Sequence, residues 1–321
     1  MKNKLALTGA VCALIALIFS SARVLAAARE ALALCGTLIL PSLFPFFVLS
    51  ILLGKLGLPR RLGKLLAPAA RLFGVSGAGV TALPIGLTGG YPLGAASVAE
   101  LHKAGLVGRE EAERLLAFCN NSGPAFLVGA IGTGLFGSPA AGLLLYACHA
   151  LAALLTGLLL RRSLNSKHNS VNIVYDIDFY AAFPAAVREA VSATLSVCGF
   201  VVCFSVLVGM LDGRGLLTLA AARLAVLTGL EAQAVRALLA GFFELGSGVG
   251  ALRGLPLTPG HLALGAALVG WGGLSVHCQT AAVLCDCELS LRRHTLGRLL
   301  SAVISAALSY AAALVFRRFL W

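Results

Sequence analysis

The stretch Gly86-Leu87-Thr88-Gly89-Gly90-Tyr91-Pro92 interrupts an apolar run that covers about residues 74–98. A second apolar run, over about residues 235–252, is interrupted by Glu244 and the glycines around it. Glycine and proline at such positions predict breaks in a helix. Unpaired backbone groups survive at membrane depth only when they are packed in protein or line a cavity. Both runs are therefore predicted to be re-entrant or interrupted helices, with a kinked but continuous span as the alternative.

The composition of the whole chain places these breaks in a membrane protein. Of 321 residues, 59% are hydrophobic and only 12% are charged, whereas soluble domains keep about a quarter of their residues charged. The net charge of +12 comes from short basic clusters between apolar runs, as in cytoplasmic loops. Because aromatic residues are not interleaved with the basic ones, nucleic acid is not an expected partner. The predicted fold class is an all-α polytopic membrane protein in a lipid bilayer.

The residue pattern gives little support for enzyme activity or for a metal site. Most of the 9 cysteines lie in apolar runs, where cysteine acts as a small buried hydrophobe. The segment Cys285-Asp286-Cys287-Glu288 has His277 and His294 nearby, but its spacing fits no structural zinc pattern. No nucleophile–base set or phosphate-binding loop is recognisable. We expect no enzyme activity, no metal, no cofactor and no disulfide framework.

The first residues allow two interpretations. Lys2 and Lys4 precede an apolar run over residues 5–20 and then small residues, a pattern that also fits a secretory signal peptide. We favour a retained transmembrane helix over residues 1–27, although it is short for a bilayer.

An internal repeat divides the rest of the chain. Ala28-Arg29-Glu30-Ala31 recurs as Val187-Arg188-Glu189-Ala190, 159 residues later, and the two broken runs correspond in order. Ser122 similarly matches Ser275, and each half ends in an apolar helix followed by two arginines. The predicted domains are a first repeat over 28–162, a polar cytoplasmic linker over 163–183 and a second repeat over 184–321.

The basic clusters predict an orientation for each repeat. They place the loops after residue 54 and after residue 160 in the cytoplasm and the uncharged turn at 136–139 outside. The first repeat then has three crossings, so the second repeat is inverted. This scheme places Arg292, Arg293, His294 and Arg298 inside, and it leaves Arg317 and Arg318 outside, against the rule.

Inverted repeats with interrupted helices are typical of secondary transporters, whose site lies between the repeats near the bilayer midplane. Polar side chains are costly there and must face a cavity or one another. The predicted substrate-binding residues are Thr88, Tyr91, Asn120, Asn121, Ser122, Ser275, His277 and Gln279. Glu244 is the candidate for ion coupling, with an ion pair to Arg253 as the alternative. His277 is equally compatible with a packing role.

The segment Asn120-Asn121-Ser122-Gly123-Pro124 is expected to start a half-helix aimed at the membrane centre. Pro124 suits the first turn of a helix, and Ser122 or Gly123 can precede it as a cap. The free N–H groups of such an end suit a carboxylate. A purely structural kink, in which the asparagines satisfy broken backbone, is the alternative.

Several of these stretches resemble one family. The chain resembles the sporulation integral membrane protein YlbJ family, also called SpoVV, in four segments. Two of them run from Gly86 to Ala95 and from Glu113 to Pro124. The other two are Leu40-Pro41-Ser42-Leu43-Phe44-Pro45-Phe46-Phe47 and Gly272-Gly273-Leu274-Ser275-Val276-His277-Cys278-Gln279. The family falls in the nucleoside-recognition or gate domain group, similar to concentrative nucleoside transporters. Gly89 and Gly123 depart from its pattern, in which serine is frequent.

The resemblance implies a role in endospore formation. It implies a multi-pass protein of the outer forespore membrane that moves dipicolinic acid, a small anion, from the mother cell. The alternatives are a nucleoside or other small-solute secondary transporter of the same fold, and a non-transporting spore-envelope assembly protein. A coupling proton or sodium ion and a homo-oligomer are compatible with the sequence but are not specified by it.

Overall fold

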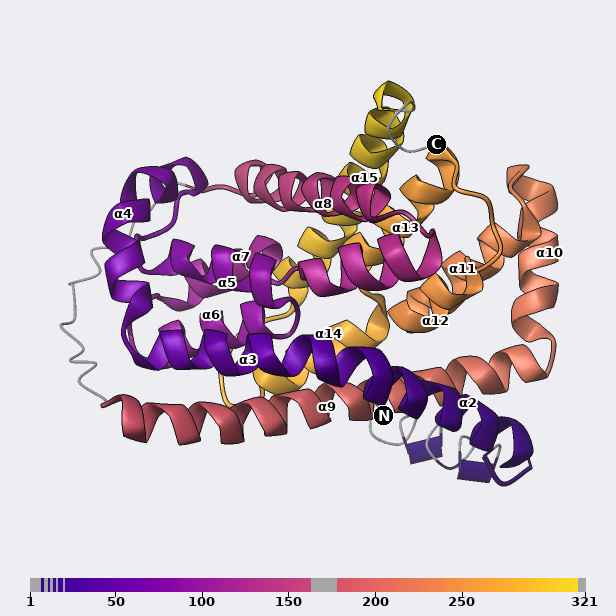
Figure 1. Cartoon of the computed structure of the whole chain (residues 1–321), viewed down its shortest axis with the longest axis horizontal. Helices are drawn as coiled ribbons and strands as arrows, with labels where there is room; N and C mark the ends of the chain where they lie inside the picture. The colour runs from indigo at the N-terminus through magenta and orange to yellow at the C-terminus, as the bar shows by residue number, and fades with distance from the viewer. Residues whose placement is uncertain are drawn as a thin grey trace.

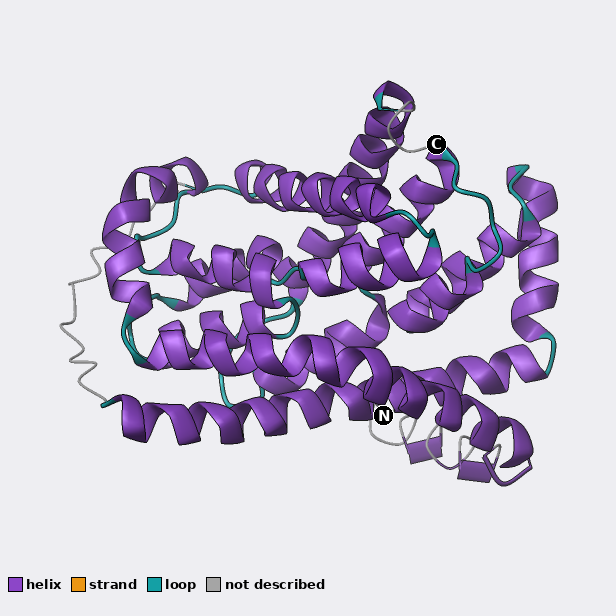
Figure 2. Cartoon of the chain, viewed as in Figure 1, coloured by secondary structure: helices purple, strands orange, loops and turns teal. Residues whose placement is uncertain are grey.

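The structure, a computed structural model, describes residues 21–162 and 178–316 together with residues 7, 8, 11, 14, 15 and 17–19. Every regular element in these ranges is helical (Figure 2). Among them, 4 helical segments are long and apolar enough to cross a membrane: Pro139–Leu159, Phe179–Gly213, Pro259–Val283 and Arg292–Val315. The predicted all-α polytopic membrane fold is confirmed. Outside the described residues lie positions 1–6, 9, 10, 12, 13, 16 and 20 of the predicted helix over 1–27, together with linker residues 163–177, Arg317 and Arg318.

The first part of the described chain runs from a long helical rod to a single long helix. The rod is made of α2 (Ser21–Leu34), the π-helical η1 (Cys35–Ile39) and α3 (Leu40–Lys55). It is followed by α4 (Leu58–Phe73), η2 (Gly79–Thr81), α5 (Ala82–Gly89), α6 (Leu93–Lys103), α7 (Arg109–Cys119), the π-helical η3 (Ala125–Leu135) and α8 (Pro139–Leu159).

The second part repeats this order. It consists of α9 (Phe179–Gly213), α10 (Leu216–Thr228), α11 (Ala232–Phe243), α12 (Leu245–Ala251), α13 (Pro259–Trp271), α14 (Gly273–Val283) and α15 (Arg292–Val315). Each part thus has a long helix, a shorter helix, two interrupted helices and a final long helix. α9 begins at Phe179, ahead of the repeat boundary predicted at 184. The domain boundaries themselves stay a prediction.

One segment differs from the sequence-based expectation. The basic stretch after residue 55 was expected to be a loop, but it forms the amphipathic helix α4. Gly57 and Gly74 bracket this helix with φ values of 78° and 62°, a left-handed conformation that glycine adopts without steric cost. The arginines and lysines of this stretch are therefore carried on a helix.

The two longest helical segments, the α2–α3 rod and α9, lie antiparallel and side by side (Figure 1). At one end the Arg23 guanidinium donates a hydrogen bond to the Gly213 carbonyl. At the other end Lys55 forms an ion pair with Glu189 over 2.7 Å. These segments occupy corresponding places in the two parts of the chain. Their antiparallel packing is the arrangement that inverted repeats require.

The helix interruptions occur where glycine or a buried polar residue breaks the backbone. Gly90 separates α5 from α6 with a φ of 83°. Residues 120–124 separate α7 from η3, and Glu244 separates α11 from α12 in extended conformation. The break between α13 and α14, at Gly272 and Gly273, was not predicted. It splits an apolar run that otherwise satisfies the length of one membrane span.

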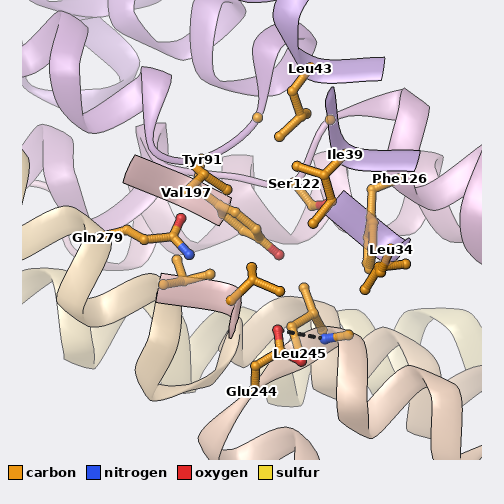
Figure 3. A pocket seen from close by; sticks show the side chains of 15 residues that line it. Leu34, Ile39, Leu43, Tyr91, Ser122, Phe126, Val197, Glu244, Leu245 and Gln279 are labelled. Atoms are coloured by element: carbon orange, nitrogen blue, oxygen red, sulfur yellow. Dashed lines mark hydrogen bonds between the residues drawn. The ribbon is translucent and has the colours of Figure 1, made fainter. Parts of the chain in front are cut away.

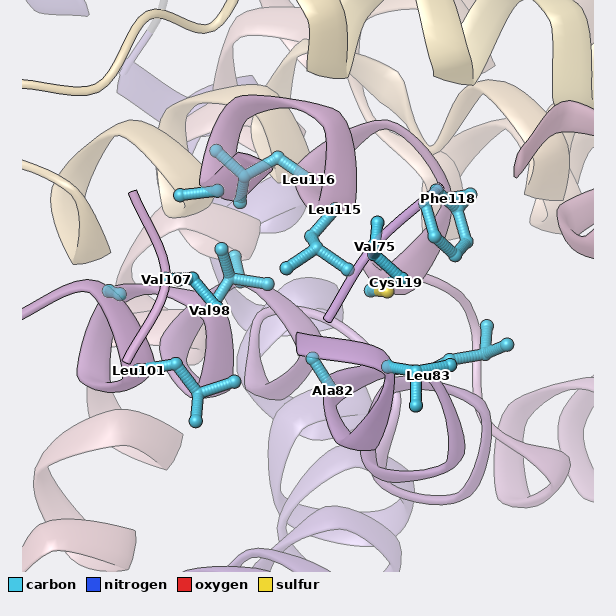
Figure 4. Close-up of a cluster of buried hydrophobic side chains, with 14 of the residues drawn as sticks. Val75, Ala82, Leu83, Val98, Leu101, Val107, Leu115, Leu116, Phe118 and Cys119 are labelled. Carbon is cyan, nitrogen blue, oxygen red and sulfur yellow. The ribbon is translucent and has the colours of Figure 1, made fainter. Parts of the chain in front are cut away.

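Buried side chains hold the broken helices together. One cluster packs α5, α6 and α7 through residues such as Val98, Leu115 and Phe118 (Figure 4). Phe118 also stacks on Phe73 with ring centroids 5.4 Å apart. A second cluster joins η3, α8 and α12 to α13. By contrast, α9 and α15 expose many large apolar side chains, as helices that face lipid do.

Close helix contacts generate a stability prediction. A Cβ at Gly297 of α15 would overlap the carbonyl group of Ala117 in α7. Gly297→Ala is therefore expected to destabilise the protein by about 1–3 kcal/mol through overpacking. The measurement is thermal unfolding of the purified protein in detergent. Gly199→Ala is the matched control, since nothing lies within 4 Å of a Cβ there; equal melting temperatures for both variants would contradict this packing.

The helix ends also generate a topology prediction. The end of α4 packs against the carbonyl of Arg162 at the end of α8, so the basic segments gather at one end of the molecule. In a cysteine-free background, Ala140→Cys should react with an impermeant maleimide added outside cells. Arg71→Cys on α4 should react only after permeabilisation, because basic segments stay in the cytoplasm. Equal labelling of both sites in intact cells would overturn this orientation.

Candidate functional site

The interrupted helices from both parts of the chain surround one cavity of about 70 Å³. Three of the breaks line it directly, through Gly90 and Tyr91, through Ser122 and Gly123, and through Glu244. The fourth break packs onto the third, because a Cβ at Gly273 would come 3.0 Å from the Leu245 nitrogen. The cavity therefore lies where the helices are interrupted and the backbone lacks regular helical hydrogen bonds.

Most of the lining is apolar. The apolar side chains come from the α2–α3 rod, from η3 and α12, and from α9 and α14: Leu34, Ile39, Leu43, Phe126, Leu245, Val197, Val201 and Val276. The polar lining side chains are Tyr91, Ser122, Glu244 and Gln279. Figure 3 shows Tyr91 and Glu244 approaching the cavity from opposite sides. A small number of polar groups in an apolar cavity is the usual composition of a small-molecule site.

Glu244 caps a helix. Its side chain is 3% exposed, and its two carboxylate oxygens accept hydrogen bonds from the Gly246 nitrogen at 2.9 Å and the Ser247 nitrogen at 2.5 Å. A carboxylate at this position satisfies the free N–H groups at the start of α12 and complements the helix dipole. The alternative ion pair with Arg253 is not formed; Arg253 is exposed, and its carbonyl oxygen accepts a hydrogen bond from Gln233.

Asn120 lies outside the cavity and links the two parts of the chain. Its amide nitrogen donates to the Thr280 hydroxyl in α14 at 2.9 Å and lies 3.2 Å from Nε2 of His294 in α15. Its carbonyl oxygen accepts a hydrogen bond from the Ala95 nitrogen at 3.3 Å. Asn120 thus ties the break after α7 to α6, α14 and α15.

Asn121 leads to a buried arginine that the sequence-based analysis missed. Its side-chain oxygen accepts a hydrogen bond from Nη2 of Arg298 at 3.2 Å, and its nitrogen donates to the Phe118 carbonyl at 2.7 Å. Arg298 is fully buried, and its Nε and Nη1 atoms have no hydrogen-bond partner. No ion pair within the described residues includes it. Arg298 is therefore a buried positive charge without an acidic partner.

The placement of Arg298 corrects its expected location among cytoplasmic basic residues. It lies inside α15 rather than before it, and it packs against α7 rather than facing water. A buried charge without a counter-charge is strongly destabilising. The sequence feature that indicates the burial of Arg298 is its position within an apolar helical run. Counting basic residues by loop concealed that feature.

The other predicted residues divide into two groups. Tyr91, Ser122, Gln279 and Glu244 line the cavity. Thr88 is exposed and donates its hydroxyl to the Pro84 carbonyl at 2.7 Å. Ser275 does not line the cavity, but its hydroxyl accepts a hydrogen bond from the Gln279 side chain at 3.2 Å. His277 donates from Nδ1 to the Gly273 carbonyl at 2.9 Å and packs on Trp271, with ring centroids 4.3 Å apart.

The start of η3 lies at the cavity, as expected of a half-helix. Pro124 is the residue that precedes η3. Gly123, just before it in the sequence, and Phe126, shortly after it, both line the cavity. No side-chain cap covers this end, unlike the start of α12. The Ser122 nitrogen instead donates to Nε2 of the buried His149 at 3.1 Å. The positive end of η3 is thus open toward the cavity.

The capping role of Glu244 can be measured directly. Glu244→Ala is expected to lower the free energy of unfolding by about 1–2 kcal/mol, because two N–H groups of α12 lose their acceptor. Glu244→Gln keeps one side-chain oxygen and should lose less. Thermal unfolding in detergent is the measurement. Glu231→Ala is the control: Glu231 precedes α11 without capping it, so a loss as large as that of Glu244→Ala would contradict the capping role.

Comparison with known proteins places the chain in a family. No family model matches it, and no solved structure matches it either. The sporulation integral membrane protein YlbJ of Bacillus subtilis (strain 168) is 31% identical over 307 residues, an alignment that covers 87% of this chain and 75% of the relative. The chain belongs to the YlbJ family of sporulation integral membrane proteins.

Proposed function

We propose that this protein is a transporter that moves a small anion across a membrane during sporulation. Dipicolinate, a dicarboxylate, is the substrate proposed here, and the outer forespore membrane is the proposed location. The relative from Bacillus subtilis is a sporulation integral membrane protein, which supports the link to sporulation. The resemblance to the YlbJ family suggests dipicolinate in particular, and the charges near the cavity support a small anion.

The observation that carries the proposal is the meeting of interrupted helices from both parts of the chain at one cavity. Broken backbone in a membrane is stable only where protein or a water-filled cavity satisfies it. Secondary transporters place such breaks at the interface of their repeats and bind the substrate there. A protein that only fills a structural role in an envelope has no need of several costly breaks around a cavity.

The charges near the cavity favour an anion. Arg298 supplies a positive charge without an acidic partner, and Asn121 connects it to the break that lines the cavity through Ser122 and Gly123. The open end of η3 adds a partial positive charge. An anion that enters the cavity balances Arg298, which lowers the cost of burying this guanidinium. Arg298 itself does not line the cavity, so its charge attracts a carboxylate there through space rather than by a direct hydrogen bond.

Glu244 gives this cavity a means of coupling to a cation. Its carboxylate lines the same cavity and repels an anionic substrate at short range. Protonation of Glu244, or binding of a cation next to it, removes that repulsion. Anion entry then accompanies proton or sodium entry, which is the coupling predicted for this residue.

The cavity must enlarge for transport. Its volume of about 70 Å³ is far below the roughly 300–1,000 Å³ of pockets that enclose drug-sized ligands. Residues of the α2–α3 rod and of α9 line it together with the interrupted helices, so we propose that movement of the rod and α9 against the interrupted helices opens it. Rocking of one repeat against the other is the usual form of this motion.

The proposal predicts substrate-specific uptake that depends on Arg298. Protein reconstituted in liposomes should accumulate labelled dipicolinate, and Arg298→Met should reduce uptake per molecule by about tenfold or more, because the anion loses the buried positive charge near the cavity. Arg223→Met, at an exposed position of α10, is the control and should transport normally. Labelled uridine tests the nucleoside alternative.

Three results would contradict the proposal. They are uptake of uridine without dipicolinate, absence of any uptake, and unchanged half-saturation in Arg298→Met. The same assay with an imposed proton or sodium gradient tests Glu244, since Glu244→Gln should abolish the dependence on the gradient. Variants are compared per correctly folded molecule, as judged by size-exclusion chromatography.

A further inference from the structure

A second cavity lies at the basic end of the molecule and shares no lining residue with the transport cavity. It measures about 260 Å³ and is formed where the end of α8 meets the middle of α7 and the start of α15. Four arginines line it: Arg114, Arg161, Arg162 and Arg293. Its remaining lining residues are Ala117, Leu159, Leu160 and Leu296. No acidic side chain contributes to the lining.

The arginines of this cavity are available to a ligand. None of the four forms an ion pair within the described residues. Arg114 is only 5% exposed; its Nη2 donates to the Gly74 carbonyl at 3.2 Å, and its buried Nε atom has no partner. The charges of Arg162 and Arg293 both act unfavourably on that of Arg114. Like charges gathered around a half-satisfied guanidinium favour a bound anion.

The acidic side chains nearest to Arg114 balance the positive charge of this cavity only in part. Glu110 and Glu111 attract the Arg114 guanidinium. One oxygen of Glu111 accepts a hydrogen bond from the Ser76 nitrogen at 2.6 Å, which holds this carboxylate toward α4 and η2. Neither acid lines the cavity. An excess of positive charge therefore remains at its surface.

The apolar part of the lining shows which kind of anion fits. Leu159 is 66% exposed and Leu296 is 47% exposed, and both belong to helices that are long and apolar enough to span the membrane. Exposed leucines on such helices contact acyl chains. The arginines at the ends of the same helices then lie at the level of the lipid headgroups. A free phosphate ion makes no use of these leucines, whereas a phospholipid contacts both surfaces.

We propose that this cavity binds the phosphate headgroup of an anionic phospholipid, with Arg114, Arg161, Arg162 and Arg293 around the phosphate and the acyl chains on Leu159 and Leu296. Planar guanidinium groups bind phosphate oxygens in pairs. Basic pockets between transmembrane helices are suited to such headgroups. The site is separate from the transport cavity, so it does not depend on the proposed substrate.

The test measures lipid binding by the purified full-length chain in dodecyl maltoside. Native mass spectrometry counts bound phosphatidylglycerol as its concentration is raised, with phosphatidylcholine and inorganic phosphate as parallel probes. The triple variant Arg161→Gln, Arg162→Gln, Arg293→Gln should bind phosphatidylglycerol roughly a hundredfold more weakly at low ionic strength. Arg114 is kept, because it also supports the fold through Gly74.

A charge-matched control separates this site from general attraction. Arg214, Arg223 and Arg253 are exposed on the second part of the chain, and their triple replacement by glutamine should leave phosphatidylglycerol binding within about twofold of wild type. An equal loss in both triple variants would overturn the proposal, as would equal binding of phosphatidylcholine by the unaltered protein. Displacement of the lipid by inorganic phosphate at the same concentration would overturn the assignment to a lipid.

Discussion

The fold depends on one constraint: a backbone that breaks within a membrane must find other partners for its N–H and C=O groups. The breaks in this chain find many of them in buried polar side chains: Glu244 accepts hydrogen bonds from the Gly246 and Ser247 nitrogens, and Nε2 of His149 accepts one from the Ser122 nitrogen. The broken segments also pack closely on one another. Gly86 and Gly94 both pack against the Cys119 carbonyl, and Gly123 lies against Gly90. A side chain at any of these glycines would force the interrupted helices apart. The same contacts bring irregular backbone to one place, and the cavity results from it.

Two opposite charges flank this arrangement, and each is held differently. Glu244 is satisfied by the backbone at the start of α12, so its charge is stabilised by the break that exposes it. Arg298 is held by single hydrogen bonds to Asn121 and Ala117 and keeps two unpartnered nitrogens. The charge of Glu244 is therefore compensated by nearby N–H groups, whereas the charge of Arg298 is compensated only in part. The proposed anionic substrate rests on this imbalance, because an anion near Arg298 would balance its charge.

The sequence predicted those features that glycine, proline and hydrophobic length determine. It predicted the helical class, the breaks near Gly90 and Glu244, and the half-helix after Pro124. It did not predict which side of a break faces the cavity, because neighbouring residues in irregular backbone point in different directions. Ser122 lines the cavity, whereas Asn120 and Asn121 bind other helices. The break at Gly272 and the burial of Arg298 depend on contacts with α11 and α7, which no local pattern reveals.

Helices α7 and α15 line the basic pocket and also hold the break after α7, whose residues Ser122 and Gly123 line the cavity. α7 carries Arg114 at the pocket and ends just before this break, while α15 carries Arg293 at the pocket and also Arg298, which donates a hydrogen bond to Asn121 in the break. Gly297 lets these two helices touch between both sites. A ligand that contacts both helices at one end favours the arrangement in which they stay packed. If transport separates α7 from α15, lipid binding and substrate binding are linked, and each alters the affinity for the other by the same factor.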